Sequence, residues 1–347
     1  MKKARPQFHT QEMQEGTNMK KEFDRRAFMR ISAMSIGAGA LLQFSPLDGT
    51  ARGNAMARLF HKQNGEGPGA FSIVQLSDTH VGFQGPPDPL GTKAFERAVD
   101  VINGLDPQPD LILFTGDLTH DSDDPAEHAR RFKTFRSISD RLRVKKRMHV
   151  PGEHDAALDG GLLFRENFGE THYSFDHRGA HFIALDNVSL GKPIVGDDQI
   201  AWLKKDLARF PKTAPIVVFT HRPLFDLKPD WEWFTADGDA VMNVLAPFDN
   251  VTVLYGHIHR ENHHTTGHAQ HHAARSLIFA FPDPSAADKK PLPFNPQQPF
   301  RNLGIRTVSG NPAAKPFVAG IDDVELSIRE LSGTEGIQQM LKQGESL

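Results

Sequence analysis

The sequence predicts an α/β fold in which buried strands carry metal-binding side chains to one edge of a sheet. Short apolar runs recur along the chain, and several are followed at once by Asp, Glu or His. Segments with apolar residues at helical spacing separate some of these runs, as in the strand–helix–strand unit of a parallel sheet. The run from Leu111 to Phe114 turns at Gly116 and places Asp117 at the end of its strand, where open α/β sheets bind ligands.

The composition is that of an ordinary soluble globular protein. The 347 residues allow one large domain or two modest ones, the net charge is -3, and 24% of the residues are charged. Without a basic excess, no nucleic-acid partner is expected. Because the chain has no cysteine, any metal site must use carboxylates and some of the 18 histidines.

Residues 1–57 are interpreted as an export signal and disordered leader. A polar lead ends in Arg25 and Arg26, a weakly apolar stretch follows over 31–42, and Ala55-Met56-Ala57 offers a cleavage site. The pattern resembles a twin-arginine signal, which is read by the machinery that exports folded proteins. We therefore expect a periplasmic or secreted bacterial protein. No stable membrane span is expected, because glycines and Pro46 interrupt the apolar stretch.

The first predicted strand begins at Phe71 and delivers Asp78 and His80 beyond its end. Residues two apart in an extended chain share a face, so this carboxylate and this imidazole can converge on one ion. Apolar residues at helical spacing predict a helix over 92–105, which leads into the strand that ends in Asp117.

Later segments repeat this arrangement. The expected elements are a helix over 125–142, a strand through 148–150, an antiparallel hairpin over 172–185, a helix over 197–210, and strands over 216–220 and 251–256. The side chains after these strands are Glu153, His154, Asp155, His221, His257 and His259. Five strand ends of this kind indicate a site for two metal ions.

The pattern of these strand ends resembles the calcineurin-like metallophosphoesterase family over about residues 71–260. In order it reads Asp-x-His, Gly-Asp, Gly-Glu-His-Asp, His and Gly-His-x-His. The resemblance implies a central β-sandwich of mixed sheets flanked by helices, in α/β/β/α layers, with a dinuclear metal centre at the C-terminal ends of strands. The metallophosphoesterase domain would span residues 58–331, followed by a tail over 332–347.

The resemblance also implies a role for each residue. The first metal would be held by Asp78, His80, Asp117 and His259. The second would share Asp117 and add Glu153, His221 and His257. His154 would act beside the scissile phosphate as an acid or transition-state donor, oriented by Asp155. Such ligands suit Mn, Fe or Zn, and two cations would generate a bridging hydroxide for in-line attack on phosphorus.

Two positions leave alternatives open. The family pattern has Asn where this chain has Glu153, which adds a negative charge to the site. An ionised Glu153 favours a trivalent–divalent metal pair or diester substrates; alternatively the carboxyl is protonated, or simply replaces Asn as an oxygen ligand. His120, three residues after Asp117, is an extra ligand, a partner of a ligand, or a solvent-facing loop residue.

Other features bear on the substrate and on the C-terminal region. We expect Arg222, Trp231 and Trp233 to contact the substrate, with the tryptophans as a lid or stacking surface, or else as a plug over the core. The His-rich tract over 263–272 is either a further metal site or a solvated hairpin. A strand over 277–281, a Pro-rich loop over 282–299, and a late strand through 324–328 that pairs with 305–308 complete the predicted elements.

These features together predict an exported, metal-dependent phosphoesterase that hydrolyses a small phosphate mono- or diester. The competing hypothesis is a catalytically weak metal-binding protein with the same fold, in which Glu153 displaces the hydroxide. His154 and Asp155 favour the enzyme, because a protein that only binds metal needs neither.

Overall fold

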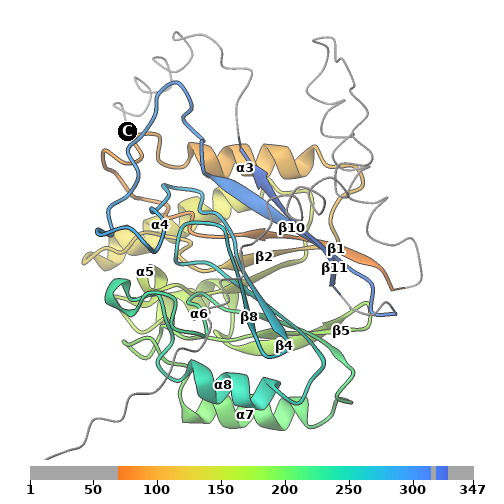
Figure 1. The fold of residues 1–347 in the computed structure, drawn as a ribbon. Coiled ribbons are helices and arrows are strands. Elements are labelled where there is room, and N and C mark those ends of the chain that lie inside the picture. Colours follow the sequence, from red (N-terminus) through yellow and green to blue (C-terminus); the bar gives the residue numbers. More distant parts are fainter. Residues whose placement is uncertain (1–68, 314–317, 327–347) are drawn as a thin grey trace, which may run out of the picture. The chain divides into compact units, whose positions relative to one another are not determined.

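Two β-sheets lie face to face, and helices cover the outer face of each (Figure 1). The first sheet has the order β11-β10-β1-β2-β3, built from β1 (Phe71–Leu76), β2 (Leu111–Thr115), β3 (Arg147–Val150), β10 (Gly304–Gly310) and β11 (Val318–Glu325). The second has the order β4-β5-β6-β7-β9-β8, built from β4 (Tyr173–His177), β5 (Ala180–Ala184), β6 (Pro215–Phe219), β7 (Asn250–Tyr255), β8 (Asn262–Thr266) and β9 (Ala269–Ala273). The α-helices are α3 (Lys93–Asn103), α4 (Pro125–Ser139), α5 (Glu153–Ala156), α6 (Leu162–Phe168), α7 (Asp197–Leu207) and α8 (Gly238–Leu245). This confirms the predicted α/β/β/α layers.

The structure is a computed structural model that describes residues 69–313 and 318–326, all within one unit of the chain, Asp48–Leu347. The expected export signal over 1–57 and the expected tail over 332–347 lie outside the described residues, as do the predicted domain limits at 58 and 331. Within the described ranges, no helix combines the length and the apolar character that crossing a membrane requires.

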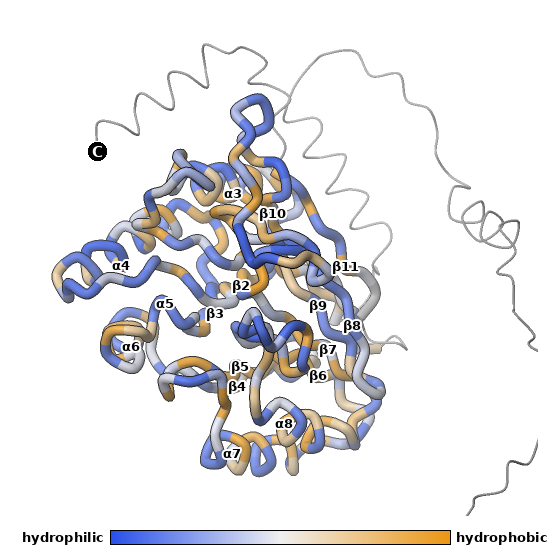
Figure 2. The backbone as a smooth tube through the Cα atoms, turned by 60° about the vertical axis from the view of Figure 1, so that its left-hand side comes forward, coloured by the Kyte–Doolittle hydropathy of each residue, from blue (hydrophilic) through white to orange (hydrophobic). Residues whose placement is uncertain are grey.

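Alternating side chains of the strands supply separate hydrophobic layers. In β2, Leu111 and Leu113 pack between the two sheets, whereas Ile112 and Phe114 pack with the inner faces of α3 and α4. All four are fully buried, and burying each such side chain contributes about 1.5–3 kcal/mol. Figure 2 shows hydrophobic colour along β2 and mixed colours along α7, which covers the second sheet with one apolar face.

Parallel pairing brings the functional strand ends together. β1, β2 and β3 run parallel in the first sheet, and β5, β6, β7 and β9 run parallel in the second. Parallel strands end at the same edge of a sheet, which is where α/β proteins bind ligands. The chain leaves β1, β2, β3, β6 and β7 in loops or short helices that carry Asp78, His80, Asp117, Glu153, His221, His257 and His259.

Most predicted elements are confirmed, with shifts at their ends. α4 ends at Ser139 and α7 at Leu207, each three residues before the predicted end. The pairing of the last strands is confirmed, since Ile305 of β10 lies opposite Val324 of β11. Residue 328, the predicted end of the late strand, lies outside the described residues.

The strand predicted over 277–281 is wrong, although most of this segment is buried. Its backbone binds other loops instead of a neighbouring strand. The N–H of Leu277 donates to the carbonyl of Asp78, and the carbonyl of Phe279 accepts from Nδ1 of His259. An apolar run indicates burial, but it does not say which groups satisfy the backbone.

Asp88 makes stability depend on pH. The residue is 4% exposed, its Oδ1 accepts from the N–H of Leu90 at 2.8 Å, and burial raises its pKa to about 7. Because the folded-state pKa lies above the usual 3.8, the stabilising effect of the bound proton is full below pH 4 and is lost as the pH rises through 7.

We expect Asp88→Asn, which is neutral at every pH, to gain stability over the wild type as the pH rises from 4 to 8. Each pKa unit is worth about 1.4 kcal/mol, so the gain should exceed about 1 kcal/mol at pH 8. Urea unfolding of both proteins at the two pH values measures it. An equal difference at pH 4 and pH 8 would contradict the assignment.

Candidate metal centre

Seven side chains form two overlapping groups that could each hold a metal ion. The groups are Asp78, His80, Asp117 and His259, and Asp117, Glu153, His221 and His257. Within each group the ligand atoms all lie within 4.8 Å of one another. Asp117 belongs to both groups, and its Oδ2 lies 3.3 Å from Nε2 of His80 and 3.3 Å from Nε2 of His221. The structure therefore brings together all seven predicted metal ligands.

The backbone at this centre adopts a conformation that residues other than glycine seldom take. Five of the ligands have positive φ, namely Asp78 (54°), His80 (39°), Asp117 (50°), His257 (66°) and His259 (51°). Eight non-glycine residues in the described ranges have positive φ, so most of this strain is concentrated at one place. Strained backbone persists where the surrounding structure enforces it, and it clusters at functional sites.

Two glycines allow the loops of the centre to approach one another. A Cβ added to Gly116 would collide with the ring of His221, and a Cβ added to Gly152 would collide with the carboxylate of Asp117. A larger residue at either position would displace a ligand. This close approach explains the glycine that precedes Asp117 and the glycine that precedes Glu153.

Hydrogen bonds on the outer side of three imidazoles set which ring nitrogen faces the centre. The three bonds run from His221 Nδ1 to the Thr115 carbonyl (2.7 Å), from His259 Nδ1 to the Phe279 carbonyl (2.9 Å), and from His257 Nε2 to the Glu232 carbonyl (3.0 Å). A neutral imidazole has one N–H, so the opposite nitrogen presents a lone pair to the centre. This is the arrangement of metal-binding histidines.

The atoms that face the centre fit a cation. Oε2 of Glu153 lies 2.8 Å from Nε2 of His221, and Oε1 lies 2.8 Å from Nδ1 of His257. Glu153 Oε2, His221 Nε2 and His257 Nδ1 are buried without a hydrogen-bond partner. Carboxylate oxygens and imidazole lone pairs this close repel one another unless a proton or a cation lies between them. A donor set of carboxylate oxygens and imidazole nitrogens suits Mn, Fe or Zn.

Neighbouring groups lower the pKa of Asp78 and of Glu153. Burial raises the pKa of Asp78, but His259, His221 and Ser77 together lower it below its usual value. Burial likewise raises the pKa of Glu153, but His257 and His221 bring it well below its usual range. Because this lowering requires protonated histidines, the alternatives for Glu153 stay predictions.

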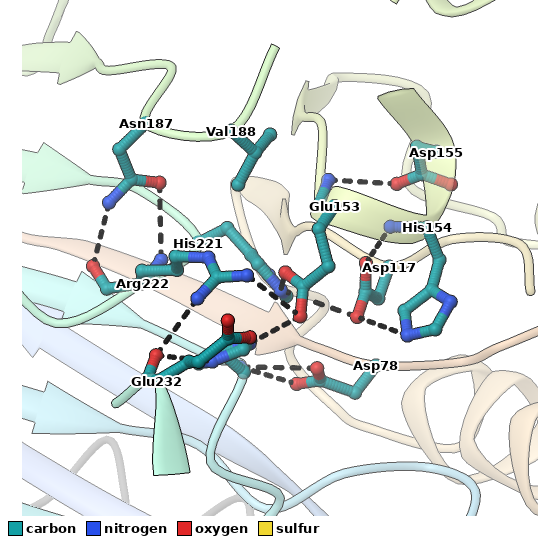
Figure 3. Close-up of polar contacts among 12 residues, drawn as sticks. Asp78, Asp117, Glu153, His154, Asp155, Asn187, Val188, His221, Arg222 and Glu232 are labelled. Atoms are coloured by element: carbon teal, nitrogen blue, oxygen red, sulfur yellow. Dashed lines mark hydrogen bonds and ion pairs between the residues drawn. The ribbon is translucent and has the colours of Figure 1, made fainter. Parts of the chain in front are cut away.

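His154 lies beside the shared carboxylate and is oriented by Asp121. Its Nε2 is 4.0 Å from Oδ2 of Asp117, and its Nδ1 is 2.7 Å from Oδ1 of Asp121 (Figure 3 shows His154 beside Asp117). Burial lowers the pKa of His154, but Asp117 and Asp121 raise it to about 9. His154 is thus placed as a proton donor at the edge of the centre.

The contact predicted between Asp155 and His154 is made by Asp121 instead. The carboxylate of Asp155 accepts from the backbone N–H groups of Gly152, Leu118 and Thr119 at 3.0, 3.0 and 2.8 Å. Asp155 therefore fastens the loop after β2 to the start of α5. The sequence signal for Asp121 was its position four residues after Asp117 in the same loop.

His120 contacts His80 and His154 and does not simply face solvent, and the three side chains form a further group that could hold a metal ion. Its Nδ1 lies 3.2 Å from Nδ1 of His80, and its ring stacks on that of His154 with centroids 4.7 Å apart. Since His80 faces Asp117 and His259 through Nε2, this contact involves its outer nitrogen. His120 thus helps to hold the orientation of His80.

Arg222 pairs with Glu153 and supports the surrounding loops (Figure 3). One terminal nitrogen lies 3.4 Å from Oε1 of Glu153, and the other donates to the carbonyl of Glu232 at 2.8 Å. The side chain of Asn187 bonds the backbone N–H and carbonyl of Arg222. The guanidinium offsets the charge that Glu153 adds, but both its ends already bind protein. The substrate contact of Arg222 stays a prediction.

The structure supports the plug alternative for the two tryptophans. Trp231 is 6% exposed and Trp233 is fully buried, and their rings meet edge to face with centroids 4.8 Å apart. They pack with Tyr255 and Ile258 in a separate hydrophobic cluster. Trp233 accordingly has no surface on which a substrate could stack. The backbone between them, at Glu232, is what reaches His257 and Arg222.

The His-rich tract forms the β8–β9 hairpin at the edge of the second sheet. Glu261, His263 and Asp323 come close enough to hold a metal ion. However, Arg306 donates to both oxygens of Asp323, and Arg275 donates to Glu261. Because these carboxylates already have cationic partners, the structure favours a hairpin with its own ion pairs over a third metal site.

The layered α/β/β/α fold places two groups that could hold metal ions at its strand ends, where α/β proteins bind ligands. Residues 71–261 match the family model described as calcineurin-like phosphoesterase, and this chain belongs to that family. Members of the family hydrolyse phosphoester bonds. The match also confirms the extent of the resemblance noted in the sequence, about residues 71–260.

The names of similar proteins specify different phosphoester substrates. A probable glycerophosphodiester phosphodiesterase of Arcobacter nitrofigilis is 28% identical over 202 residues, which cover 54% of this chain and 71% of that protein. A 3',5'-cyclic adenosine monophosphate phosphodiesterase of Escherichia coli K12 is 28% identical over 218 residues, covering 56% and 72%. A serine/threonine-protein phosphatase of Rattus norvegicus is 27% identical over 240 residues, covering 60% and 76%. A solved dimetal phosphatase from Danio rerio shares the fold, with a TM-score of 0.51 and 14% identity over 74% of this chain and 98% of that one.

Asp117→Asn should lower the metal content, because a neutral amide bridges two cations poorly. We expect the reconstituted wild type to retain two ions per chain and the variant one or fewer. Elemental analysis after gel filtration measures this. Asp88→Asn, which changes a buried carboxyl outside the centre, serves as the control and should retain as much metal as the wild type. Two ions retained by Asp117→Asn would contradict the assignment.

Proposed function

We propose that this protein is an exported phosphoesterase that uses two metal ions, chosen from Mn, Fe and Zn, to hydrolyse small phosphate mono- or diesters. The observation that carries the proposal is the carboxylate of Asp117, which belongs to two groups of metal-binding atoms at once. Membership of the phosphoesterase family supports it, and so do relatives named as diesterases and as a phosphatase.

The ligand groups, His154 and Asp121 have separate roles in the proposed hydrolysis. Cations held by the two groups would lower the pKa of water and stabilise charge on the phosphoryl oxygens. His154, at the edge of the centre, donates a proton to the leaving oxygen as its bond to phosphorus breaks and water supplies the new oxygen. Asp121 accepts from Nδ1 of His154 and so turns Nε2 toward Asp117 and the reacting group.

An assay with mono- and bis-p-nitrophenyl phosphate tests the proposal. Metal-free protein is reconstituted with Mn, Fe or Zn, and the turnover of both esters is compared with that of the metal-free form and of Asp117→Asn. We expect activity only in reconstituted wild type. If the wild type retains two ions and hydrolyses neither ester, the protein is a metal-binding protein with this fold instead.

Asp121→Asn should lower kcat, because an amide holds the His154 ring less firmly and does not favour its protonated form. A positioned acid contributes roughly 10²–10⁴-fold to rate, so a loss of about tenfold or more is expected. Metal content should be unchanged, since Asp121 is outside both ligand groups. Asp123→Asn, an exposed carboxylate in the same loop, is the matched control. Equal kcat values in the two variants would remove Asp121 from the mechanism.

Export is proposed on the sequence of the first 57 residues, in particular on the pair Arg25 and Arg26. Export by a route for folded proteins suits a protein that needs its metals in place before it crosses. Changing both arginines to lysine should leave folded, unprocessed protein in the cytoplasm. Fractionation of a bacterial expression host followed by mass measurement of the product checks this. Mature protein of the variant outside the cytoplasm would show that another route operates.

A further inference from the structure

A lysine from the Pro-rich loop over 282–299 reaches the rim of the metal centre. This loop lies beyond residues 71–261, the part that matches the family model. Nζ of Lys289 donates to the carbonyl of Trp231 at 2.8 Å, and the next carbonyl along, that of Glu232, accepts from His257. The ammonium group of Lys289 is thus bound to the residue before Glu232, whose carbonyl positions His257.

A second contact connects Lys289 to the other ligand group through Phe281. Its Nζ lies 5.4 Å from the centre of the Phe281 ring, within the range of a cation–π interaction. The Phe281 ring in turn packs against the ring of His259 with centroids 5.0 Å apart. Lys289 is therefore connected to His257 through the 231–232 backbone and to His259 through the ring of Phe281.

The charges of the metal centre act on Lys289. Burial lowers its pKa, and among the nearby charges Glu153 opposes this most, with Asp117 also contributing. The residue as a whole is exposed, and the hydrogen bond that its ammonium group makes is part-buried. An ammonium has three N–H donors, and the carbonyl of Trp231 uses one of them.

Arg222 is less suited to bind substrate than its position in the sequence suggested. It is 6% exposed, and its two terminal nitrogens are directed at Glu153 and at the carbonyl of Glu232 (Figure 3). Its charge is paired with Glu153, the carboxylate that this chain has where the family pattern has Asn. Lys289, in contrast, is an exposed residue, and the carbonyl of Trp231 uses only one of its three donors.

We propose that Lys289 binds the phosphoryl group of the substrate and favours monoesters over diesters. This inference rests on the proposed function, because it takes the substrate to be a phosphoester. A monoester carries a second negative charge at neutral pH, and a compact ammonium group interacts with it as a point charge. A diester, with one negative charge, gains less from the same lysine.

The test compares Lys289→Met with Lys290→Met. Lys290 is the next residue, is 78% exposed and pairs with Asp288, so its loss controls for a missing surface charge in the same loop. The first measurement is calorimetric binding of inorganic phosphate to the metal-loaded proteins, which requires no turnover. We expect Lys289→Met to weaken phosphate binding about tenfold, which corresponds to about 1.4 kcal/mol. Lys290→Met should bind as the wild type does.

The second measurement is kcat/KM for mono- and bis-p-nitrophenyl phosphate, with metal content and Tm recorded for each protein. Lys289→Met should lose about tenfold on the monoester, mostly through KM, and much less on the diester. Lys289→Arg, which keeps the charge, should recover most of the loss. Unchanged phosphate binding in Lys289→Met would overturn the inference. So would an equal loss on both esters with a lower Tm or metal content, because Lys289 would then only support the Trp231 loop. If the wild type turns over neither ester but binds phosphate through Lys289, the proposed function fails and the binding role stands.

Discussion

The structure depends on bringing buried carboxylates and imidazoles together around Asp117. Placing the buried carboxylates of Asp78 and Asp117 next to the half-buried Glu153 is unfavourable unless positive charge lies among them. The lone pairs of His221, His257 and His259 face the same centre and increase the need for positive charge there. The left-handed backbone at five of the ligands and the glycines at positions 116 and 152 serve the same close approach. Cations in the two ligand groups would satisfy these requirements together.

The surroundings of the centre hold its ligands in place before any substrate arrives. The carbonyl of Glu232, in a loop anchored by the buried ring of Trp233, accepts from both His257 and Arg222. Asp155 ties the loop after β2 to the start of α5 through three backbone N–H groups. Supporting contacts of this kind fix the orientation of metal ligands and tune their basicity. The tryptophans therefore affect the site through the backbone, not through their rings.

Strand patterns predicted an α/β fold and the convergence of seven side chains at one sheet edge, whereas the α/β/β/α layers and the division of these side chains between two metals were what the family resemblance implied. Apolar runs mark strands, and parallel strands end at one edge, so the residues after Phe114 or Val150 had to converge. The paths of the loops have no such periodicity. Whether Asp121 or Asp155 would reach the ring of His154 depended on the turn after Asp117, and the burial of Trp233 depended on how its loop folds back. Lys289 is more than 25 residues beyond the last ligand in sequence, and no local pattern connects it to the centre.

Glu153 shows how a departure from the family pattern is accommodated. A carboxylate in place of a neutral amide adds one negative charge, and the guanidinium of Arg222 lies beside it. Anomalous X-ray diffraction from crystals of the metal-reconstituted protein tests the central claim most directly. The account predicts two anomalous peaks about 3.5–4 Å apart, with the carboxylate of Asp117 between them and Glu153 on the second. A single peak that Asp117 does not contact, or peaks only at the β8–β9 hairpin, would contradict it.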